Sequence, residues 1–453
     1  MNDNLTYIDD SRKESIAFRY VGEDTLWSRE GSEHRNLSAG KYPCTRIHIS
    51  ESYATANRVI IIQNMSNTVT RSHAIYTIAV IGFIYTLHMV LPMYSNSSFL
   101  SLFADENTLG IIYMLSAAVG ILGYLIAPSI IRRFGNYATT VCLICVQIVL
   151  FYFLITSTSA TTIATVFILQ SAVIALIGLG LDIFLENYTD SRNVGSVRGL
   201  YTTTLNASWL IGPLLGSMLI NGAENYRDTY VAALAMLFPL LYLIHKNFPR
   251  FKDPNYTHLS PWHLIRHISS DKNWVKLFFA NVILQTFYAW MVVYSPIYLN
   301  KTIGFGWEEI AVILTIMLIP FPLIQYPLGK LADKRYGEKE IMAIGFAVMG
   351  LATIALAFID IKSLMFWAFA LFMTRVGAAA AEIMIETYFF KTVSAKDSAV
   401  LGSFRVTRPV AYFIAPLITG VGLLFTSHEY LFVIIGIVSL IGLYPALTIR
   451  DTK

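Results

Sequence analysis

The chain has 453 residues, of which 55% are hydrophobic and only 14% charged, with a formal net charge of +4. A soluble protein of this length needs more charge to cover its surface, so the composition excludes a soluble globular protein. From about residue 73 onward, apolar stretches alternate with short polar breaks. Each stretch has roughly twenty residues, enough to cross a ~30 Å hydrocarbon core as a helix. We therefore expect an all-α protein embedded in a lipid bilayer.

Residues 1–72 precede the first apolar stretch and are polar. They lack the basic start, apolar centre and small-residue cleavage site of a signal peptide. We expect a cytoplasmic N-terminal tail, disordered or weakly structured. The alternative is that translation starts at Met65, so that residues 1–64 do not belong to the native protein.

The apolar stretches form two sets of six. We expect an N-terminal six-helix bundle within 73–247, a central cytoplasmic loop at 248–274 and a C-terminal six-helix bundle within 275–448. In the loop, Ser260 followed by Pro261 favours the start of a short helix. The predicted spans are 73–95, 108–131, 138–156, 160–186, 198–221, 229–247, 275–299, 308–330, 340–359, 363–389, 400–425 and 429–448.

Three short patterns occur twice, in the same order and at nearly the same shift along the chain. They are Asp182, Glu186 and Tyr188 with Glu382, Glu386 and Tyr388; Pro92, Tyr94 and Asn96 with Pro296, Tyr298 and Asn300; and Gly199 and Pro213 with Gly402 and Pro416. Such repetition indicates a duplicated half. In a hydrophobic chain it predicts two similar bundles with a site between them, which points to the movement of a solute across a membrane.

Lysine and arginine concentrate in alternate loops. By the positive-inside rule we expect these loops and both termini, including the short C-terminus 449–453, to be cytoplasmic, in the plasma membrane. The basic residues of these loops are Arg132, Arg133, Arg192, Arg198, Lys246, Arg250, Lys252, Arg266, Lys272, Lys330, Lys334, Arg335, Lys339, Lys391 and Lys396. The chain has no basic patch with interleaved aromatics, so we expect no nucleic-acid partner. It also lacks a phosphate-binding Gly-x-x-x-x-Gly-Lys loop, which excludes nucleotide hydrolysis by that motif.

One loop motif identifies a family. After the eighth predicted span the chain has Gly329, Asp333, Arg335 and Gly337 in the order Gly-Lys-Leu-Ala-Asp-Lys-Arg-Tyr-Gly. This resembles the loop motif of the major facilitator superfamily, with one extra residue before the second glycine. The resemblance covers residues 73–448 and implies twelve helices in two pseudo-symmetric bundles, alternating access, no cofactor and a monomer. It also implies that Asp333 locks the half-bundles together through basic residues and a helix N-terminus.

The first half carries only part of this motif. Arg132, Arg133 and Gly135 correspond to the basic pair and the glycine, but Ile131 stands where the aspartate is expected. We therefore expect the lock to depend on Asp333 of the second half. A second segment, around Gly212 and Pro213 in the fifth span, resembles one common in proton-coupled exporters of this superfamily. Small residues at this spacing also pack helices closely, which is the alternative interpretation.

Two ionisable residues within the predicted spans have no counterpart in the other half. Arg375 corresponds to Ala175, and His88 corresponds to Val292. A charge at membrane depth is costly unless it faces a watery cavity or a partner. The resemblance places both on cavity-lining helices, so both are candidates for substrate binding. The alternatives are an ion pair of Arg375 with Glu382 and a packing role for His88. Further cavity candidates are Gln285, Tyr288, Asn206 and Gln170.

The acidic pairs lie toward the cytoplasmic ends of the fourth and tenth spans, each at i and i+4. Like charges at that spacing repel unless a basic group lies between them. We expect Arg198, Arg405 and Arg408 to pair with Asp182, Glu186, Glu382 and Glu386 in a cytoplasmic gate. Protonation of Asp182 or Glu382 during transport and simple solvation at the interface are the alternatives.

These patterns favour a secondary transporter of a small solute, energised by an ion gradient or by the gradient of its own substrate. Proton coupling and export are the expected details. An uncoupled facilitator and a non-transporting membrane sensor or scaffold are the alternatives. No nucleophile–base pair or metal-ligand set repeats at membrane depth, so we expect neither an enzyme nor a metal site.

Overall fold

The computed structural model describes residues 5–9, 14–21, 24–28, 51–93, 95–220, 226–257, 261–423 and 430–452. The chain divides into two compact units, residues 1–63 and 64–453. The first unit contains a three-stranded antiparallel sheet in which Leu5 pairs with Phe18 and Ala17 pairs with Ser28. Its strands are β1 (Leu5–Asp9), β2 (Glu14–Val21) and β3 (Asp24–Ser28).

The N-terminal tail predicted at 1–72 lies partly outside the described residues. Helix α1 (Glu51–Met93) begins well before the predicted start of the first span at residue 73. The start of translation at Met65, the alternative given above, stays a prediction.

The second unit is helical, and its helices follow the twelve predicted spans in order, which confirms the all-α fold. The first half begins with α1 and continues with α3 (Glu106–Phe134), α4 (Asn136–Thr156), α5 (Ala160–Tyr188), α6 (Val194–Leu219) and α7 (Arg227–Asn247). The second half contains α9 (Lys272–Lys301), α10 (Trp307–Leu318), α11 (Pro320–Leu331), α12 (Lys339–Leu356), α13 (Leu364–Thr392), α14 (Ser398–Leu423), α15 (Leu431–Ile441) and α16 (Leu443–Thr448).

Three short elements connect these helices. They are α2 (Asn96–Ser101), α8 (Pro261–Ser270) and a π-helical turn at Ala332–Tyr336. Helix α8 begins at Pro261, as the sequence predicts, although Ser260 lies outside the described residues.

Among the described residues, ten helical stretches are long and apolar enough to cross a membrane. Helices α6 and α14, which match the fifth and eleventh predicted spans, are not among these ten. They carry Arg198, Arg405 and Arg408. An ionisable residue in a membrane span requires a partner or water, so these two helices are expected to face the interior of the bundle.

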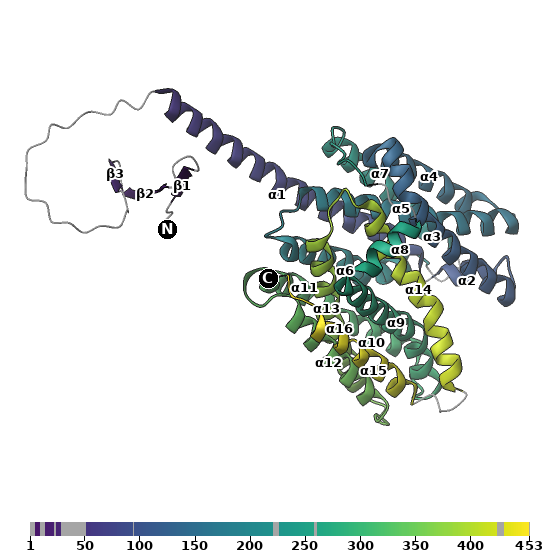
Figure 1. Ribbon diagram of the computed structural model, residues 1–453. Helices are drawn as coiled ribbons and strands as arrows, with labels where there is room; N and C mark the ends of the chain where they lie inside the picture. The colour runs from purple at the N-terminus through teal and green to yellow at the C-terminus, as the bar shows by residue number, and fades with distance from the viewer. Residues whose placement is uncertain are drawn as a thin grey trace, which may run out of the picture. The chain divides into compact units, whose positions relative to one another are not determined.

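Helices α6 and α14 join the two halves. Helix α6 packs against α11 and α13 of the second half, and α14 packs against α3 and α5 of the first. In Figure 1, α6 and α11 lie side by side, with α3, α4, α5 and α7 grouped on one side of them and α10, α12, α15 and α16 on the other. The two crossings are pseudo-symmetric, because Gly199 of α6 faces the Gln325 carbonyl and Gly402 of α14 faces the Tyr124 carbonyl.

The crossing of α6 and α11 is the closer of the two. A Cβ added to Gly329 would lie 2.1 Å from the Gly195 carbonyl oxygen, and one added to Gly195 would lie 2.4 Å from the Gly329 oxygen. Two backbones can approach this closely only where both residues lack a side chain. The glycines therefore fix the contact between the halves.

We expect Gly329→Ala to destabilise the protein, because its methyl group would overlap the Gly195 backbone, which cannot move without shifting α6. Overpacking of this kind costs about 1–3 kcal/mol. The check is the melting temperature of the purified protein in detergent. Gly120→Ala is the matched control, since its Cβ would meet its nearest neighbour at 3.8 Å, an ordinary contact. Equal melting temperatures for the two variants would contradict the assigned role of Gly329.

Candidate functional site

A cluster of buried ion pairs connects the two halves. It lies at the end of the bundle that carries the loops 132–136 and 332–338, which we call the basic end. Asp182 of α5 and Arg198 of α6 come from the first half, and Glu386 of α13 and Arg405 of α14 come from the second. The cluster brings together three of the four carboxylates, Asp182, Glu186 and Glu386, and two of the three arginines that the sequence analysis grouped.

Arg198 forms the part of the cluster within the first half. Its side chain is fully buried, and its guanidinium lies 2.9 Å from an Asp182 oxygen and 3.4 Å from a Glu186 oxygen. The same guanidinium lies 3.0 Å from the centroid of the Phe390 ring, which belongs to α13 of the second half. A desolvated cation on a ring face is favourable, so Arg198 also contacts the opposite half.

Arg405 bridges the halves directly. It donates two hydrogen bonds to Asp182, at 2.7 and 3.1 Å, and two to Glu386, at 2.5 and 3.2 Å. Paired charge-assisted bonds from one guanidinium fix both distance and orientation. Asp182 therefore accepts hydrogen bonds from an arginine of each half.

Glu382 has different surroundings from Asp182, its counterpart in the repeat. It accepts a hydrogen bond of 2.6 Å from the Gln325 amide, whose oxygen accepts one of 2.8 Å from Asn206. The hydroxyl of Tyr288 also interacts with Glu382. This chain of neutral polar groups again crosses between the halves, since Asn206 lies on α6 and Gln325 on α11.

Asp333 makes a second contact between the halves at the basic end. Its carboxylate accepts hydrogen bonds from the backbone of Gly195, at 3.0 Å, and of Ser196, at 2.7 Å, and from the Ser196 hydroxyl at 2.9 Å. These groups form the first turn of α6, where the helix dipole favours a carboxylate. Lys391 lies 3.4 Å from the same carboxylate and 2.5 Å from that of Glu338.

Two aspartates that the sequence analysis missed occupy equivalent places in the two halves. The backbone N–H of Asn136 donates to Asp253 at 2.7 Å, and that of Glu338 donates to Asp451 at 3.4 Å. Each carboxylate lies beside a glycine with a left-handed backbone, Gly135 at φ 80° and Gly337 at φ 72°. The signal was present in the sequence, because each aspartate follows the last helix of its half.

The central loop is attached to both halves. Asp253 binds the start of α4 in the first half, and it also accepts a 2.5 Å hydrogen bond from Tyr256. Burial, followed by that hydrogen bond, raises the pKa of Tyr256. Thr257 binds the second half, with its backbone N–H 3.0 Å from the Lys396 carbonyl oxygen and its hydroxyl 2.9 Å from Asp397.

Arg375 and His88, the two unmatched residues of the repeat, are both buried. The guanidinium of Arg375 lies 5.0 Å from the Phe287 ring centroid and 5.8 Å from that of Tyr288. The His88 ring donates a hydrogen bond from Nδ1 to the Tyr85 carbonyl oxygen within its own turn, and its centroid lies 6.0 Å from that of the Phe151 ring. His88 thus lies buried in the core of the first half, and its role in binding or packing stays a prediction.

The other candidates are spread more widely. Arg408 is exposed, and its guanidinium lies 5.4 Å from the centroid of the Trp209 ring. Gln170 is buried on α5, and Gln285 is half-buried on α9. Arg132 and Arg133 are exposed, and Arg133 lies over its neighbour Phe134. The side chain of Arg335 lies outside the described residues. Within the described part of the chain, no group of three or more His, Cys, Asp or Glu could hold a metal ion.

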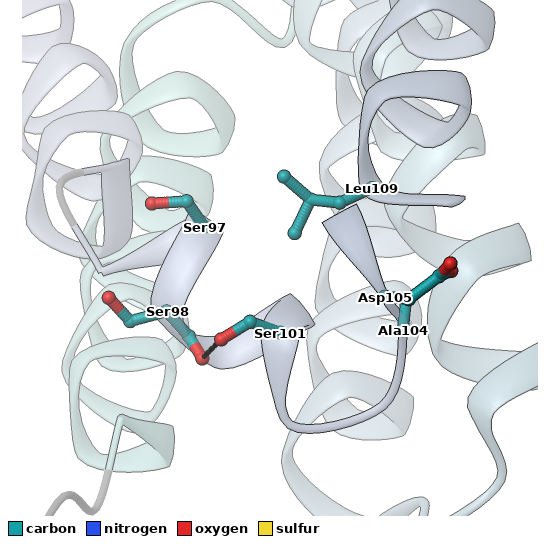
Figure 2. Close-up of a pocket in the computed structure, with 6 residues that line it drawn as sticks. All are labelled: Ser97, Ser98, Ser101, Ala104, Asp105 and Leu109. Atoms are coloured by element: carbon teal, nitrogen blue, oxygen red, sulfur yellow. Dashed lines mark hydrogen bonds between the residues drawn. The ribbon is translucent and has the colours of Figure 1, made fainter. Parts of the chain in front are cut away.

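A depression of about 540 Å³ lies between the first two spans, at the end of the bundle opposite the basic end. Figure 2 shows Ser97, Ser98 and Ser101 of α2 on one side, with Leu109 pointing toward Ser97 and Asp105 pointing away. A hydrogen bond of 2.8 Å from Ser101 to the Ser98 carbonyl holds the short helix together. None of the sequence-predicted site residues lines this depression.

Two similar sets of membrane helices, joined by buried ion pairs at one end, define a multi-pass membrane protein built from two pseudo-symmetric halves. The family model of the Major Facilitator Superfamily matches residues 73–319 and 295–453. The chain therefore belongs to the Major Facilitator Superfamily and is a membrane transporter of that fold.

Solved structures of this superfamily share the fold at low sequence identity. The human organic anion transporter MFSD10 (TETRAN) is 13% identical with a TM-score of 0.69, covering 83% of this chain and 99% of that one. FucP in the outward conformation is 12% identical with a TM-score of 0.71, covering 84% of this chain and 100% of that one. A variant of the E. coli fucose:proton symporter FucP is 13% identical with a TM-score of 0.69, covering 84% and 100%. No curated protein sequence matched the chain.

We expect Asp333→Asn to loosen the start of α6, because the amide cannot replace a carboxylate that accepts three hydrogen bonds at a helix N-terminus. The loss is about 1 kcal/mol for the cap and dipole terms together. Hydrogen exchange followed by mass spectrometry should show faster exchange of the backbone amides of Gly195 and Ser196. Asp360→Asn, at an exposed loop position, is the control and should leave this exchange unchanged. Unaltered exchange in Asp333→Asn would contradict the assigned contact.

Proposed function

We propose that the protein is a secondary transporter that moves a small solute across the cell membrane by alternating access. The single observation that carries this proposal is the bridge from Arg405 to Asp182 of one half and Glu386 of the other. Two similar halves joined by such a bridge at one end can rock about a central site, exposing it to alternate sides of the membrane. In this proposal the described conformation is the one closed at the basic end.

The charge of the loops supports an orientation. The basic loops lie at the end that the ion-pair cluster closes, and the positive-inside rule assigns such loops to the cytoplasm. The cluster is then a cytoplasmic gate, and both termini are cytoplasmic. The hydrogen bonds of Asp333 to the first turn of α6 are a second contact that holds this gate closed.

The energetics of the cluster suit a gate. Removing one partner of a buried ion pair costs about 3–5 kcal/mol, because the other charge is left without compensation. Opening the basic end separates Arg405 from Asp182, but Arg405 keeps Glu386 and Asp182 keeps Arg198. Each half therefore retains a neutralising partner, which lowers the cost of opening below that of isolated charges.

Glu382 is the carboxylate that we propose for proton coupling. Asp182 accepts hydrogen bonds from two arginines, which stabilise its ionised form. Glu382 accepts one from the neutral amide of Gln325 and interacts with the hydroxyl of Tyr288. A proton on Glu382 removes the negative charge toward which the Gln325 amide points. This weakens the chain from Glu382 through Gln325 to Asn206 and so favours separation of the halves.

Export is the direction that the resemblance around Gly212 and Pro213 favours. In the structure, Gly212 faces Val90 and Gly216 faces the Leu91 carbonyl, so these small residues also pack α6 closely against α1. The proposal for direction therefore rests on the sequence resemblance alone. Uncoupled flux and sensing without transport are outcomes of the experiments below.

We expect Arg405→Gln to shift the protein toward a conformation that is open at the basic end, because the bridge between the halves is lost. Lys246 and Lys396 are exposed positions in opposite halves. Spin labels on Lys246→Cys and Lys396→Cys report the opening as a longer distance between the labels, measured by double electron–electron resonance. The native cysteines are replaced by serine in this background. Arg250→Gln, at an exposed position of the central loop, is the control. An unchanged distance distribution in Arg405→Gln would refute the gate.

We expect Glu382→Gln to uncouple transport from the proton gradient, because the amide cannot titrate. A thermal-shift screen of small solutes first identifies a compound that stabilises the detergent-solubilised protein. Its flux into proteoliposomes is then measured with and without a pH gradient. Wild-type flux should respond to the gradient, and Glu382→Gln flux should not. Wild-type flux that ignores the gradient would establish an uncoupled facilitator, and a library without any stabilising compound would favour the sensor.

A further inference from the structure

Arg408 is an exposed cation deep within the bundle. It lies ten residues into α14, which starts at Ser398. That is about 15 Å along the helix axis, half the thickness of a ~30 Å hydrocarbon core. Its side chain is nevertheless exposed. An arginine at this depth is favourable only where water or a partner reaches it.

The neighbours of Arg408 come from both halves. Its guanidinium lies 5.4 Å from the Trp209 ring of α6. It also interacts electrostatically with Tyr85 of α1, Tyr124 of α3 and Tyr288 of α9, and with Glu382 of α13. Helices from both halves therefore surround the side chain.

Arg408 has a different role from Arg405, which lies one turn closer to the start of α14. The guanidinium of Arg405 donates four hydrogen bonds to Asp182 and Glu386. Arg408 instead lies over the Trp209 ring, 5.4 Å from its centroid, and its planar guanidinium carries five N–H donors in a fixed geometry. Such a fork can bind two oxygens of one oxyanion.

The charges around this site balance. Four arginines and four carboxylates occupy the inner parts of α5, α6, α13 and α14: Arg198, Arg375, Arg405 and Arg408 with Asp182, Glu186, Glu382 and Glu386. If Glu382 takes up a proton, one positive charge in excess remains. A single negative charge on a bound molecule restores neutrality.

We propose that Arg408 and Trp209 form the binding site for a small planar organic monoanion, and that the anion binds together with a proton on Glu382. Arg408 holds the oxyanion through its fork, and Trp209 with the neighbouring tyrosines contacts the planar body. The groups that face Glu382 in this scheme are Tyr288 of α9, Gln325 of α11, Glu386 of its own helix, and Arg405 and Arg408 of α14. The proton part rests on the proposed coupling role of Glu382, whereas the anion part does not.

Benzenesulfonate is a suitable probe, because it joins a planar ring to a monoanionic sulfonate that stays ionised and carries no proton itself. Its matched neutral analogue is benzenesulfonamide. Binding of each to the full chain in nanodiscs is measured by isothermal titration calorimetry, with the melting temperature as a second readout. We expect benzenesulfonate to bind and to raise the melting temperature, and the sulfonamide to bind at least about tenfold more weakly. Equal affinity for the two compounds, or no binding of benzenesulfonate, overturns the proposal.

Variants assign the binding to the site. Arg408→Gln should weaken benzenesulfonate about tenfold to a hundredfold, since it removes charge-assisted hydrogen bonds. The affinity of Arg408→Lys, which keeps the charge but not the fork, should lie between those of wild type and Arg408→Gln. Trp209→Leu should weaken binding more than Trp209→Phe, which retains a ring. Arg250→Gln is the control. The melting temperature without ligand verifies that each variant folds, and unchanged affinity in Arg408→Gln overturns the assignment.

The proton part has its own readout. Calorimetry in two buffers of different ionisation enthalpy gives the number of protons taken up on binding. Wild type should take up as many as one proton, with affinity rising by up to about tenfold for each unit that the pH falls through the titration of Glu382. Glu382→Gln should take up none and bind independently of pH. Binding without proton uptake overturns coupling alone, whereas the spin-label distances of Arg405→Gln test the gate without any ligand.

Discussion

A buried carboxylate shared by two arginines is the constraint on which the rest of the structure depends. Asp182 accepts hydrogen bonds from Arg198 of its own half and from Arg405 of the other. Charges in a low-dielectric interior must be compensated, so α6 and α14 have to run where their arginines reach α5 and α13. The glycines at the crossing of α6 and α11 permit this approach. Packing and electrostatics therefore place the same two helices between the halves.

The repeat applies to the carboxylates but not to the cations. Asp182 and Glu386 follow the duplicated pattern, whereas Leu401 occupies the position equivalent to Arg198 and Thr202 the one equivalent to Arg405. One acidic pair is consequently neutralised mainly by arginine, while Glu382 of the other contacts an amide and a hydroxyl. Carboxylates at equivalent positions of a repeat can serve different tasks when their surroundings differ, and we assign Asp182 to holding the halves together and Glu382 to titration. The second half thus carries most of the residues that we assign to coupling and binding.

Apolar length and repetition were enough to predict the spans, the two halves and the fold, because these depend on local composition. The grouping of the acidic pairs with arginine followed from repulsion between like charges on one helical face. Which arginine meets which carboxylate did not follow, since Arg405 and Arg408 lie three residues apart on α14, yet Arg405 pairs with Asp182 and Glu386 while Arg408 lies over the Trp209 ring. His88 was placed in the core by Phe151, which is distant in sequence. Asp253 and Asp451 were overlooked because their shared place after the last helix of each half is a weaker signal than a repeated motif.

The attachment of the central loop has a mechanical consequence. Asp253 is tied to the first half through Asn136, and Thr257 is tied to the second half through Lys396 and Asp397. Thr257 is only four residues after Asp253 in the chain, and an extended chain of four residues spans about 14 Å at most. The loop is therefore a short tether between the halves. The halves can part at the basic end only as far as it extends, and any wider swing must first release Asp253 or Thr257.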